Sequence, residues 1–310
     1  MKTLSNVISE QIKIAKAVKS LFNDYDWKMY ASINHGYTVK DLLIIYGIII
    51  LNILIISILE SLNFNYLIIY TPFAIFLQGV VYNWINVQVH EASHYLLFKN
   101  KKINDKYCDL FLSGLIGYTV KGYRTSHSAH HSKLHSNDDP DLDLYKNDIQ
   151  KYSKFRIIMS DLLGITFYKK LLQKKELSEE VNTSIIVTQI ISLLVFILIF
   201  EYRGPLFYIV FMILPLVTIY PFIIRVRTVI QHSNYKSKHR IWISRSTNSN
   251  LLEHIIFGAR MDWHFEHHLF PNIPYYNLKK INREILKSEF EKKNLDLFTS
   301  KYFKEFKTNF

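Results

Sequence analysis

Hydrophobic residues in this chain are gathered into four long blocks separated by polar segments. The blocks cover residues 42–59, 64–84, 184–200 and 206–224, and none of them contains a charged side chain. Each is close to the roughly 17–25 apolar residues that a helix needs to cross about 30 Å of hydrocarbon. Buried helices of soluble domains carry a polar stripe every 3.6 residues, and these blocks show almost none. The pattern predicts four membrane-spanning helices in two hairpins, residues 42–84 and 184–224.

The composition fits this division into apolar and polar parts. Of the 310 residues, 49% are hydrophobic, the mean hydropathy is +0.05 and the formal net charge is +12, which excludes disordered and collagen-like chains. The single cysteine, Cys108, excludes a disulfide framework within the chain and a cysteine-rich metal cage. The N-terminal segment is polar and charged through Lys40, so we expect no cleaved signal peptide.

The basic residues predict the orientation. All but one of the 38 Lys and Arg residues lie outside the two short links, because link 61–63 has none and link 201–205 has only Arg203. Under the positive-inside rule, residues 1–40, 85–183 and 225–310 are cytoplasmic. We therefore predict one all-α domain over residues 1–310, with a helical cytoplasmic cap and both termini on that side. Stretch 110–120, interrupted by two glycines, is too short to cross and is predicted to be interfacial or re-entrant.

The excess of positive charge suggests attraction to anionic lipid at the cytoplasmic leaflet. Nucleic acid is not an expected partner, because the basic residues are dispersed and no binding motif accompanies them. From Asn277 onward, Ile281 and Ile285 alternate with lysine and arginine, which predicts a basic amphipathic helix lying on the membrane surface.

Histidines form three clusters outside the four blocks. Of the 13 histidines, 12 occur from His90 onward, and the clusters read His-Glu-Ala-Ser-His at 90–94, His-Ser-Ala-His-His at 127–131 and His-Phe-Glu-His-His at 264–268. Residues at i, i+3 and i+4 share one face of a helix, so each cluster directs two or three imidazoles the same way. One such pair is weak evidence of a metal site, but three clusters on one predicted side of the membrane are far more specific.

Neutral imidazole is the commonest metal ligand and suits iron, copper, zinc and nickel. The three clusters hold eight histidines, more than the four ligands of one zinc site, so two metal ions are predicted.

In these motifs the chain resembles the integral-membrane fatty acid desaturases and their hydroxylase and ketolase relatives. That family carries three histidine boxes, H-x(3,4)-H, H-x(2,3)-H-H and H/Q-x(2,3)-H-H, on the cytoplasmic side of two transmembrane hairpins. The surrounding residues are similar too: Asp-Pro-Asp at 139–141 follows the second box, Leu-Phe-Pro at 269–271 follows the third, and Tyr-Tyr-Asn-Leu continues at 275–278.

The resemblance implies two iron ions held by about nine histidines, with one ligand near the end of the fourth span. Gln231-His232 fits that place, and His254, four residues after Asn250, is a lower-ranked alternative. His135 is expected to lie beside the site or at the surface, and His35 at the surface. The implied ligands are His90, His94, His127, His130, His131, His232, His264, His267 and His268.

An all-histidine ligand set is neutral, so carboxylates one layer out must orient the rings and offset the charge of the metals. Glu91 and Asp141 are the favoured residues for this role. Five further acids lie near enough in sequence to contribute: Asp138, Asp139, Asp143, Asp262 and Glu266. No catalytic residue beyond the metal ligands is implied.

The family's reaction consumes O₂ and two electrons and places a double bond in an acyl chain, so the expected substrate is a fatty acid or membrane lipid. The haem motif His-Pro-Gly-Gly of a fused cytochrome b5 is not present, so electrons are expected from a separate ferredoxin or cytochrome b5. Such carriers are commonly acidic, and the basic cap offers electrostatic complementarity.

Two other readings stay open at this point. One keeps the two metals but makes the chain a hydroxylase or ketolase acting on a lipid, a sphingoid base or a carotenoid. The other is a histidine-rich membrane transporter of zinc or copper. A transporter places ionisable residues at mid-membrane along its pathway, and the four blocks have almost none, which favours the enzyme.

Overall fold

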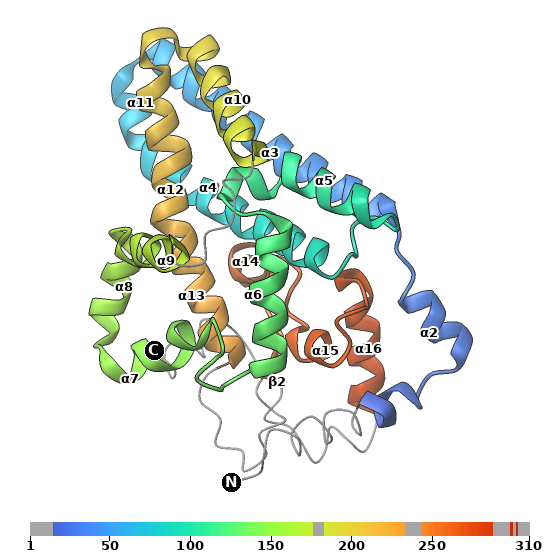
Figure 1. The fold of residues 1–310 in the computed structure, drawn as a ribbon. Helices are drawn as coiled ribbons and strands as arrows, with labels where there is room; N and C mark the ends of the chain where they lie inside the picture. The colour runs from blue at the N-terminus through green and yellow to red at the C-terminus, as the bar shows by residue number, and fades with distance from the viewer. Residues whose placement is uncertain (1–14, 176–182, 233–243, 288–297, 300–301, 303–310) are drawn as a thin grey trace.

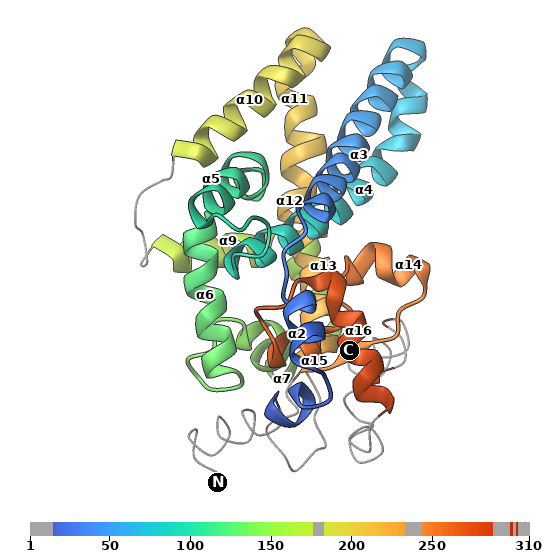
Figure 2. The same ribbon diagram turned by 90° about the vertical axis from the view of Figure 1, so that its right-hand side faces the viewer.

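The computed structural model describes residues 15–175, 183–232, 244–287, 298–299 and 302. Most of these residues are helical, which confirms the predicted all-α fold. Among the described residues, the short strand β1 (Ser246–Thr247) pairs in parallel with β2 (Phe298–Thr299). Two helical hairpins extend in the same direction from a cap made of the other helices (Figures 1 and 2). The chain ends, predicted to be cytoplasmic, lie outside the described residues.

The first hairpin consists of α3 (His35–Leu62) and α4 (Phe64–Ser93), which pack against each other. Only Asn63 separates the two helices, and its side chain caps α4 by accepting a hydrogen bond from the backbone N–H of Asn65 at 2.8 Å. Helix α4 continues nine residues beyond the predicted end of the apolar block at Trp84. The same rigid helix therefore forms the hairpin and carries His90.

The second hairpin is less regular. Gly204 stands where the two arms turn against each other: a Cβ on it would lie 2.5 Å from the Cα of Ile197, so only glycine permits this approach. The last helix of the hairpin extends past the apolar block and ends at His232. In chain order the elements are α10 (Thr183–Phe200), η3 (Glu201–Arg203), α11 (Gly204–Tyr208), η4 (Ile209–Ile213), α12 (Leu214–Val217) and α13 (Ile219–His232).

The turns of both hairpins lie at the same end of the molecule, far from the cap (Figure 1). The guanidinium of Arg203 in the second turn pairs with the carboxylate of Glu60 beside the first. Three described helical stretches are long and apolar enough to cross a membrane: Asp24–Leu62, Phe64–Ser93 and Thr183–His232, the last of which contains both arms of the second hairpin. That the chain crosses the membrane four times stays a prediction.

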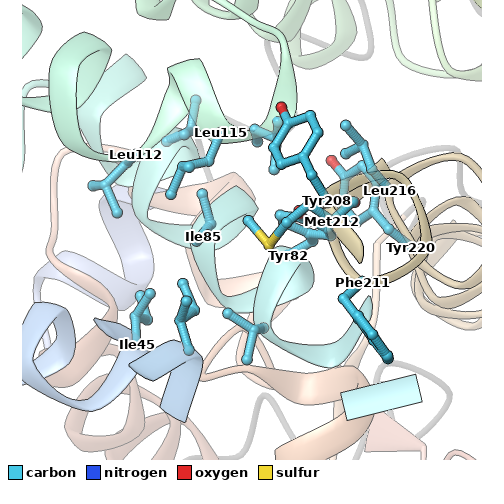
Figure 3. Packing of buried hydrophobic residues seen from close by; sticks show 14 of the residues in the cluster. Ile45, Tyr82, Ile85, Leu112, Leu115, Tyr208, Phe211, Met212, Leu216 and Tyr220 are labelled. Carbon is cyan, nitrogen blue, oxygen red and sulfur yellow. Dashed lines mark hydrogen bonds between the residues drawn. The ribbon is translucent and has the colours of Figure 1, made fainter. Parts of the chain in front are cut away.

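Aromatic and aliphatic side chains fill the space between the hairpins (Figure 3). The hydroxyl of Tyr82 donates to the backbone carbonyl of Met212 at 3.0 Å, joining α4 to η4. Ile85, Leu216 and Tyr220 are buried in the same cluster. This packing fixes α4 and α13 relative to each other where they enter the cap.

The first part of the cap packs onto this core. Its elements are α5 (Lys101–Phe111), η1 (Ser113–Ile116), α6 (Val120–Lys133), η2 (Asp143–Asn147), α7 (Asp148–Lys151), α8 (Lys154–Leu162) and α9 (Ile165–Lys175). All four residues of η1 are buried, and a Cβ on Gly114 would lie 2.5 Å from Oγ1 of Thr188 in α10. The middle of the stretch 110–120 is therefore covered by protein, while Leu110 and Phe111 are exposed, and its interfacial or re-entrant placement stays a prediction.

The second part of the cap contains α14 (Leu251–Glu253), η5 (His254–Gly258), α15 (His264–Leu269) and α16 (Tyr275–Lys287). Helix α16 is amphipathic as predicted, but its apolar residues Leu278, Ile281 and Ile285 are fully buried in the protein. The expectation that this face lies on the membrane is therefore wrong. Helix α2 (Asp24–Tyr30) covers the same region, where the rings of Trp27 and Phe270 lie 4.8 Å apart.

Candidate metal centre

The structure brings together nine histidines from four parts of the chain. Within each of two groups, one ring nitrogen per residue lies within 4.8 Å of the others. The two groups adjoin, because the rings of His131 and His268 are 4.3 Å apart across the boundary. One group contains His90, His94, His127, His131 and His267, and the other contains His130, His232, His264 and His268. These are the nine histidines that the sequence motifs selected.

Helix geometry explains how each element contributes. Helix α6 contributes three histidines, and because His127 and His131 are four residues apart they face the first group together, while His130 faces the second. Helix α15 divides its histidines in the same way between the two groups. The ends of α4 and α13 supply His90 and His232, and His94 follows directly after α4.

The facing ring nitrogens are very close. Nε2 of His131 lies 3.0 Å from Nε2 of His127 and 3.1 Å from Nε2 of His267. In the second group, Nε2 of His264 lies 2.8 Å from Nε2 of His232 and 3.1 Å from Nε2 of His268. A neutral imidazole nitrogen carries either one proton or one lone pair, so it cannot bond to two such neighbours at once.

These separations fit neighbouring ligand atoms around a metal ion. Two nitrogens that each lie about 2.1 Å from one ion and meet at right angles are about 3.0 Å apart. In the first group, both ring nitrogens of His90 and Nε2 of His94 are buried and have no hydrogen-bond partner among the described residues. Buried polar atoms rarely remain unpaired, so this set of donors fits two cations, one in each group.

Burial keeps most of these rings neutral. Desolvation lowers the pKa of His127, His131, His267 and His268 well below the ordinary value, and the neighbouring imidazoles lower it further. Burial lowers the pKa of His94 to about 4. A neutral imidazole has a free lone pair, so the environment prepares these side chains to bind metal.

His130 is the exception, because a carboxylate lies against it. Its Nδ1 is 2.9 Å from Oδ1 of Asp139. Burial lowers the pKa of His130, but the Asp139 hydrogen bond and the charges of Asp139 and Asp141 outweigh burial and raise it. For Asp139 itself, burial raises the pKa, but His130 and the Tyr145 hydroxyl outweigh this effect and lower it to about 2.

The acid against His130 is therefore Asp139, whereas the sequence favoured Asp141. Oδ2 of Asp141 is 3.8 Å from His130 Nδ1, and its own backbone N–H donates to Asp139 at 3.0 Å. The turn after α6 thus directs Asp139 inward, and backbone groups of Asp141 and His135 hold it there. The motif alone does not separate these two acids, because the turn decides which one points inward.

Glu91, the other favoured acid, is buried behind the first group. Its Oε1 lies 3.6 Å from Nδ1 of His90, and its Oε2 accepts a hydrogen bond of 3.1 Å from the backbone N–H of Tyr275. Tyr275 is the first residue of α16, so the amino end of that helix faces the carboxylate, which is a favourable arrangement.

Other candidates lie outside the two groups. His254, the alternative ninth ligand, directs Nδ1 to the carboxylate of Asp262, and 36% of its side chain is exposed. Glu266 turns away from the groups toward Ser246 and Asn282. Nε2 of His135 lies 2.9 Å from the backbone carbonyl of His232, so this residue is beside the site, and His35 is exposed as expected. His239 lies outside the described residues.

A cavity of about 40 Å³ lies between the two groups. Histidines of both groups line it together with Tyr123, Asp141, Arg227 and Gln231. The guanidinium of Arg227 donates to the side-chain oxygens of Asn83 at 2.8 Å and Asn86 at 3.1 Å. This volume is enough for about three small molecules of the size of water, in contact with ring nitrogens of both groups.

The structure thus combines helices that are long and apolar enough to cross a membrane with two histidine groups that could hold metal ions. The family model for fatty acid desaturases matches residues 67–301 of this chain. The chain belongs to the fatty acid desaturase family.

Two curated relatives show similarity to it. One is the dihydrorhizobitoxine desaturase of Bradyrhizobium elkanii, 29% identical over 234 residues, which are 68% of this chain and 66% of that protein. Another is the Delta(5) fatty acid desaturase fat-4 of Caenorhabditis elegans, 34% identical over 91 residues, 29% of this chain and 20% of that protein. The chain thus spans just under two thirds of the first relative and a fifth of the second.

Proposed function

We propose that this protein is an O₂-dependent membrane desaturase that uses two iron ions to introduce a double bond into the acyl chain of a fatty acid or lipid. The observation that carries the proposal is the pair of adjoining histidine groups in a member of the desaturase family. The names of both relatives describe desaturases, and one of these names specifies a fatty acid.

Five histidines would hold one ion and four the other. Imidazole ligands suit several metals, and iron is proposed because withdrawing hydrogen from an unactivated methylene needs an oxidant that no amino acid supplies. When bound, the two irons would supply the electrons and the open coordination positions with which O₂ is activated. The neutral, buried ring nitrogens described above support this role.

The protein's own residues orient the rings. Asp139 keeps a proton on Nδ1 of His130, so the lone pair of that ring is at Nε2, toward the second group. Glu91 lies on the Nδ1 side of His90 at 3.6 Å, a distance too long for a hydrogen bond. Tyr145 donates its hydroxyl to Asp139 and fixes the carboxylate in turn. The burial of these groups excludes bulk water from the reacting atoms.

Electrons would come from a separate carrier, a ferredoxin or a cytochrome b5. We also propose that the cap faces the cytoplasm, where such carriers meet it, because the basic residues gather in the cap and its flanking segments. Ionic contacts between a basic cap and an acidic carrier weaken as salt is added. Activity with a purified donor should therefore fall as ionic strength rises, and constant activity would count against this docking mode.

The decisive experiment expresses the full chain in a host with simple lipids and analyses the acyl chains by mass spectrometry. A loss of two hydrogens supports the desaturase, and a gain of one oxygen assigns a hydroxylase instead. Metal analysis of the purified protein should find about two iron ions per chain. A His267→Ala variant that keeps full oxidising activity would refute the proposed centre, because His267 belongs to the first group.

A further inference from the structure

A second cavity lies outside the metal centre, between α9, α13 and the loop after η1. Its volume is about 80 Å³, and its walls are mainly apolar: Ile116, Leu144, Phe167 and Ile224 contribute to it. One charged side chain, that of Lys170, also lines it. A mainly apolar cavity with one placed charge is typical of a site for an amphiphilic ligand.

This cavity and the cavity between the two histidine groups, called the metal-side cavity below, lie along one face of α13. Ile224 lines the apolar cavity, and Arg227, Thr228 and Gln231 line the other. The spacings of three, four and seven residues place these side chains on the same side of the helix. At about 1.5 Å per residue, Ile224 lies about 12 Å along the axis from His232, the metal-group residue at the end of α13.

A thin layer of side chains separates the two cavities. Tyr118 lines the apolar cavity and Tyr123 the metal-side cavity, and their rings contact each other with centroids 6.3 Å apart. Tyr220, at the apolar cavity, accepts a hydrogen bond from Asn86 at 2.9 Å, and Asn86 accepts one from Arg227. The contacting rings of Tyr118 and Tyr123 therefore separate a ligand in the apolar cavity from the metal-side cavity.

The outer side of the cavity faces an apolar, basic surface. Helices α8 and α9 lie beside α13 at the base of the second hairpin (Figure 1), and the turn between them approaches Val217 of α12 at Gly164. Apolar side chains on this surface are exposed: Phe155, Leu163, Ile165, Tyr168 and Leu172. Exposed apolar side chains interleaved with lysines are typical of a helix at the lipid–water interface.

Among the residues that the structure describes, the ammonium of Lys170 makes no hydrogen bond or ion pair. The Lys170 charge interacts with the Asp161 carboxylate, but this carboxylate already accepts hydrogen bonds from Nε of Arg225 at 2.6 Å and from the hydroxyl of Thr166. An anionic group at the opening of the cavity would meet an available cation there, while its hydrocarbon chain entered the apolar part.

We propose that this cavity binds the substrate by its head, with an anionic carboxylate or phosphate group on Lys170 and the acyl chain directed along α13 toward the histidines. The substrate class is thus an anionic amphiphile that enters sideways from the membrane interface. This inference rests on the proposed function, because it assumes that the metal centre acts on an acyl chain.

The test measures binding of a fluorescent fatty acid, cis-parinarate, and its uncharged methyl ester to the full-length protein in detergent. Wild type should bind the acid at least about tenfold more tightly than the ester, the effect of one partly buried ionic contact. Lys170→Glu should remove this preference and leave ester binding unchanged. Lys169→Glu is the matched control, because Lys169 is exposed and does not line the cavity.

Unchanged preference for the acid in Lys170→Glu would overturn the proposal. Ile224→Trp, which fills the cavity, should weaken the binding of both probes. Binding as tight as that of the wild type in a folded Ile224→Trp protein would also overturn the proposal.

Competition identifies the head group. Displacement of cis-parinarate by palmitate points to a carboxylate head, and displacement by lysophosphatidylglycerol points to a phosphate head. Displacement by neither lipid contradicts the anionic site. If the wild type desaturates lipids but the Lys170→Glu and Ile224→Trp substitutions leave probe binding unchanged, only the proposed binding site is wrong. If the Lys170 effects appear without desaturation, only the proposed function is wrong.

Discussion

Nδ1 of His130 lies 2.9 Å from Oδ1 of Asp139, and both side chains are almost fully buried. His130 belongs to the group of four histidines, and Asp139 belongs to neither group. The carboxylate therefore decides which nitrogen of the ring carries the proton, and through this it controls the lone pair that faces the group.

Replacing Asp139 should weaken metal binding without touching a ligand. In Asp139→Ala, the proton of His130 is no longer fixed at Nδ1, and the affinity for the metal at the four-histidine group should fall about 10- to 100-fold. Competition with a chelator of known affinity measures the change. Asp138→Ala is the control, because its side chain is 74% exposed. Equal affinities in the two variants would show that Asp139 does not orient the ring.

The ninth metal-binding histidine can be identified by substituting each of the two candidates separately. His232→Ala removes one of the four ring nitrogens of the second group, so it should weaken metal binding there and lower the metal content below that of the wild type. His254→Ala should keep both ions, since His254 contacts Asp262 outside the groups. Elemental analysis of the purified variants decides the matter. The reverse pattern would assign the ninth place to His254.

The metal-free protein should lose stability as the solution is acidified. The folded state holds His127, His131, His267 and His268 with lowered pKa values, and that of His94 is lowered to about 4. The unfolded chain binds these protons near pH 6.5, so stability is full above that pH and falls as pH drops below it. His130, with a raised pKa, acts in the opposite direction but is one group among several.

Thermal unfolding of chelator-treated protein at pH 7.5 and pH 5.5 measures this effect. Each lowered group contributes up to about 1.4 kcal/mol per pH unit, so the unfolding midpoint should drop by several degrees at the lower pH. Reloading the metal should raise the midpoint at both pH values but should not remove the drop, because the unfolded chain still takes up the protons. A midpoint that rises on acidification would contradict the assignment of buried neutral rings.

Two ion pairs between separate elements should differ strongly in how much they contribute to the free energy of unfolding. The pair of Asp161 with Arg225 is buried at 0% and 1% exposure and attaches α8 to α13. Asp161→Ala leaves a buried guanidinium with only part of its partners, and the free energy of unfolding should fall by about 3 kcal/mol. Glu60→Ala breaks the Arg203 pair, in which Arg203 is 43% exposed, and should cost less than about 1 kcal/mol.

Denaturant unfolding of both variants in the same detergent measures these differences. The reference is the wild-type protein, and a chemically matched change is made at each site, since both variants remove one carboxylate. A larger loss for Glu60→Ala than for Asp161→Ala would mean that the turns of the hairpins, and not the junction with the cap, limit stability.

Patterns that act over a few residues predicted the larger part of this protein. Long uncharged runs define apolar helices wherever they occur, and the i, i+3, i+4 spacing of His127, His130 and His131 follows from helix geometry alone. For this reason the apolar segments and the eight histidines of the three clusters could be read from the sequence, whereas His232 was implied only by the resemblance to the family. The extension of α4 to His90 needed one further fact, that the helix does not stop where the apolar run stops.

Features that depend on distant contacts could not be predicted in this way. An apolar stripe on α16 is the same in sequence whether it packs on lipid or on protein, and the residues that cover it come from α15 and the N-terminal region. The choice of Asp139 over Asp141 depends on the turn after α6 and on Tyr145, several residues further along. The apolar cavity at Lys170 is formed by four segments that no local pattern connects.

The division of each histidine cluster between two groups determines the order in which the protein can be completed. Both groups contain members from α6 and from α15, and the last of these is His268. A growing chain that has released only the first hairpin and α6 therefore has no complete set of ligands. Neither group reaches its full set of histidines until the second hairpin and α15 have folded onto the first hairpin and α6.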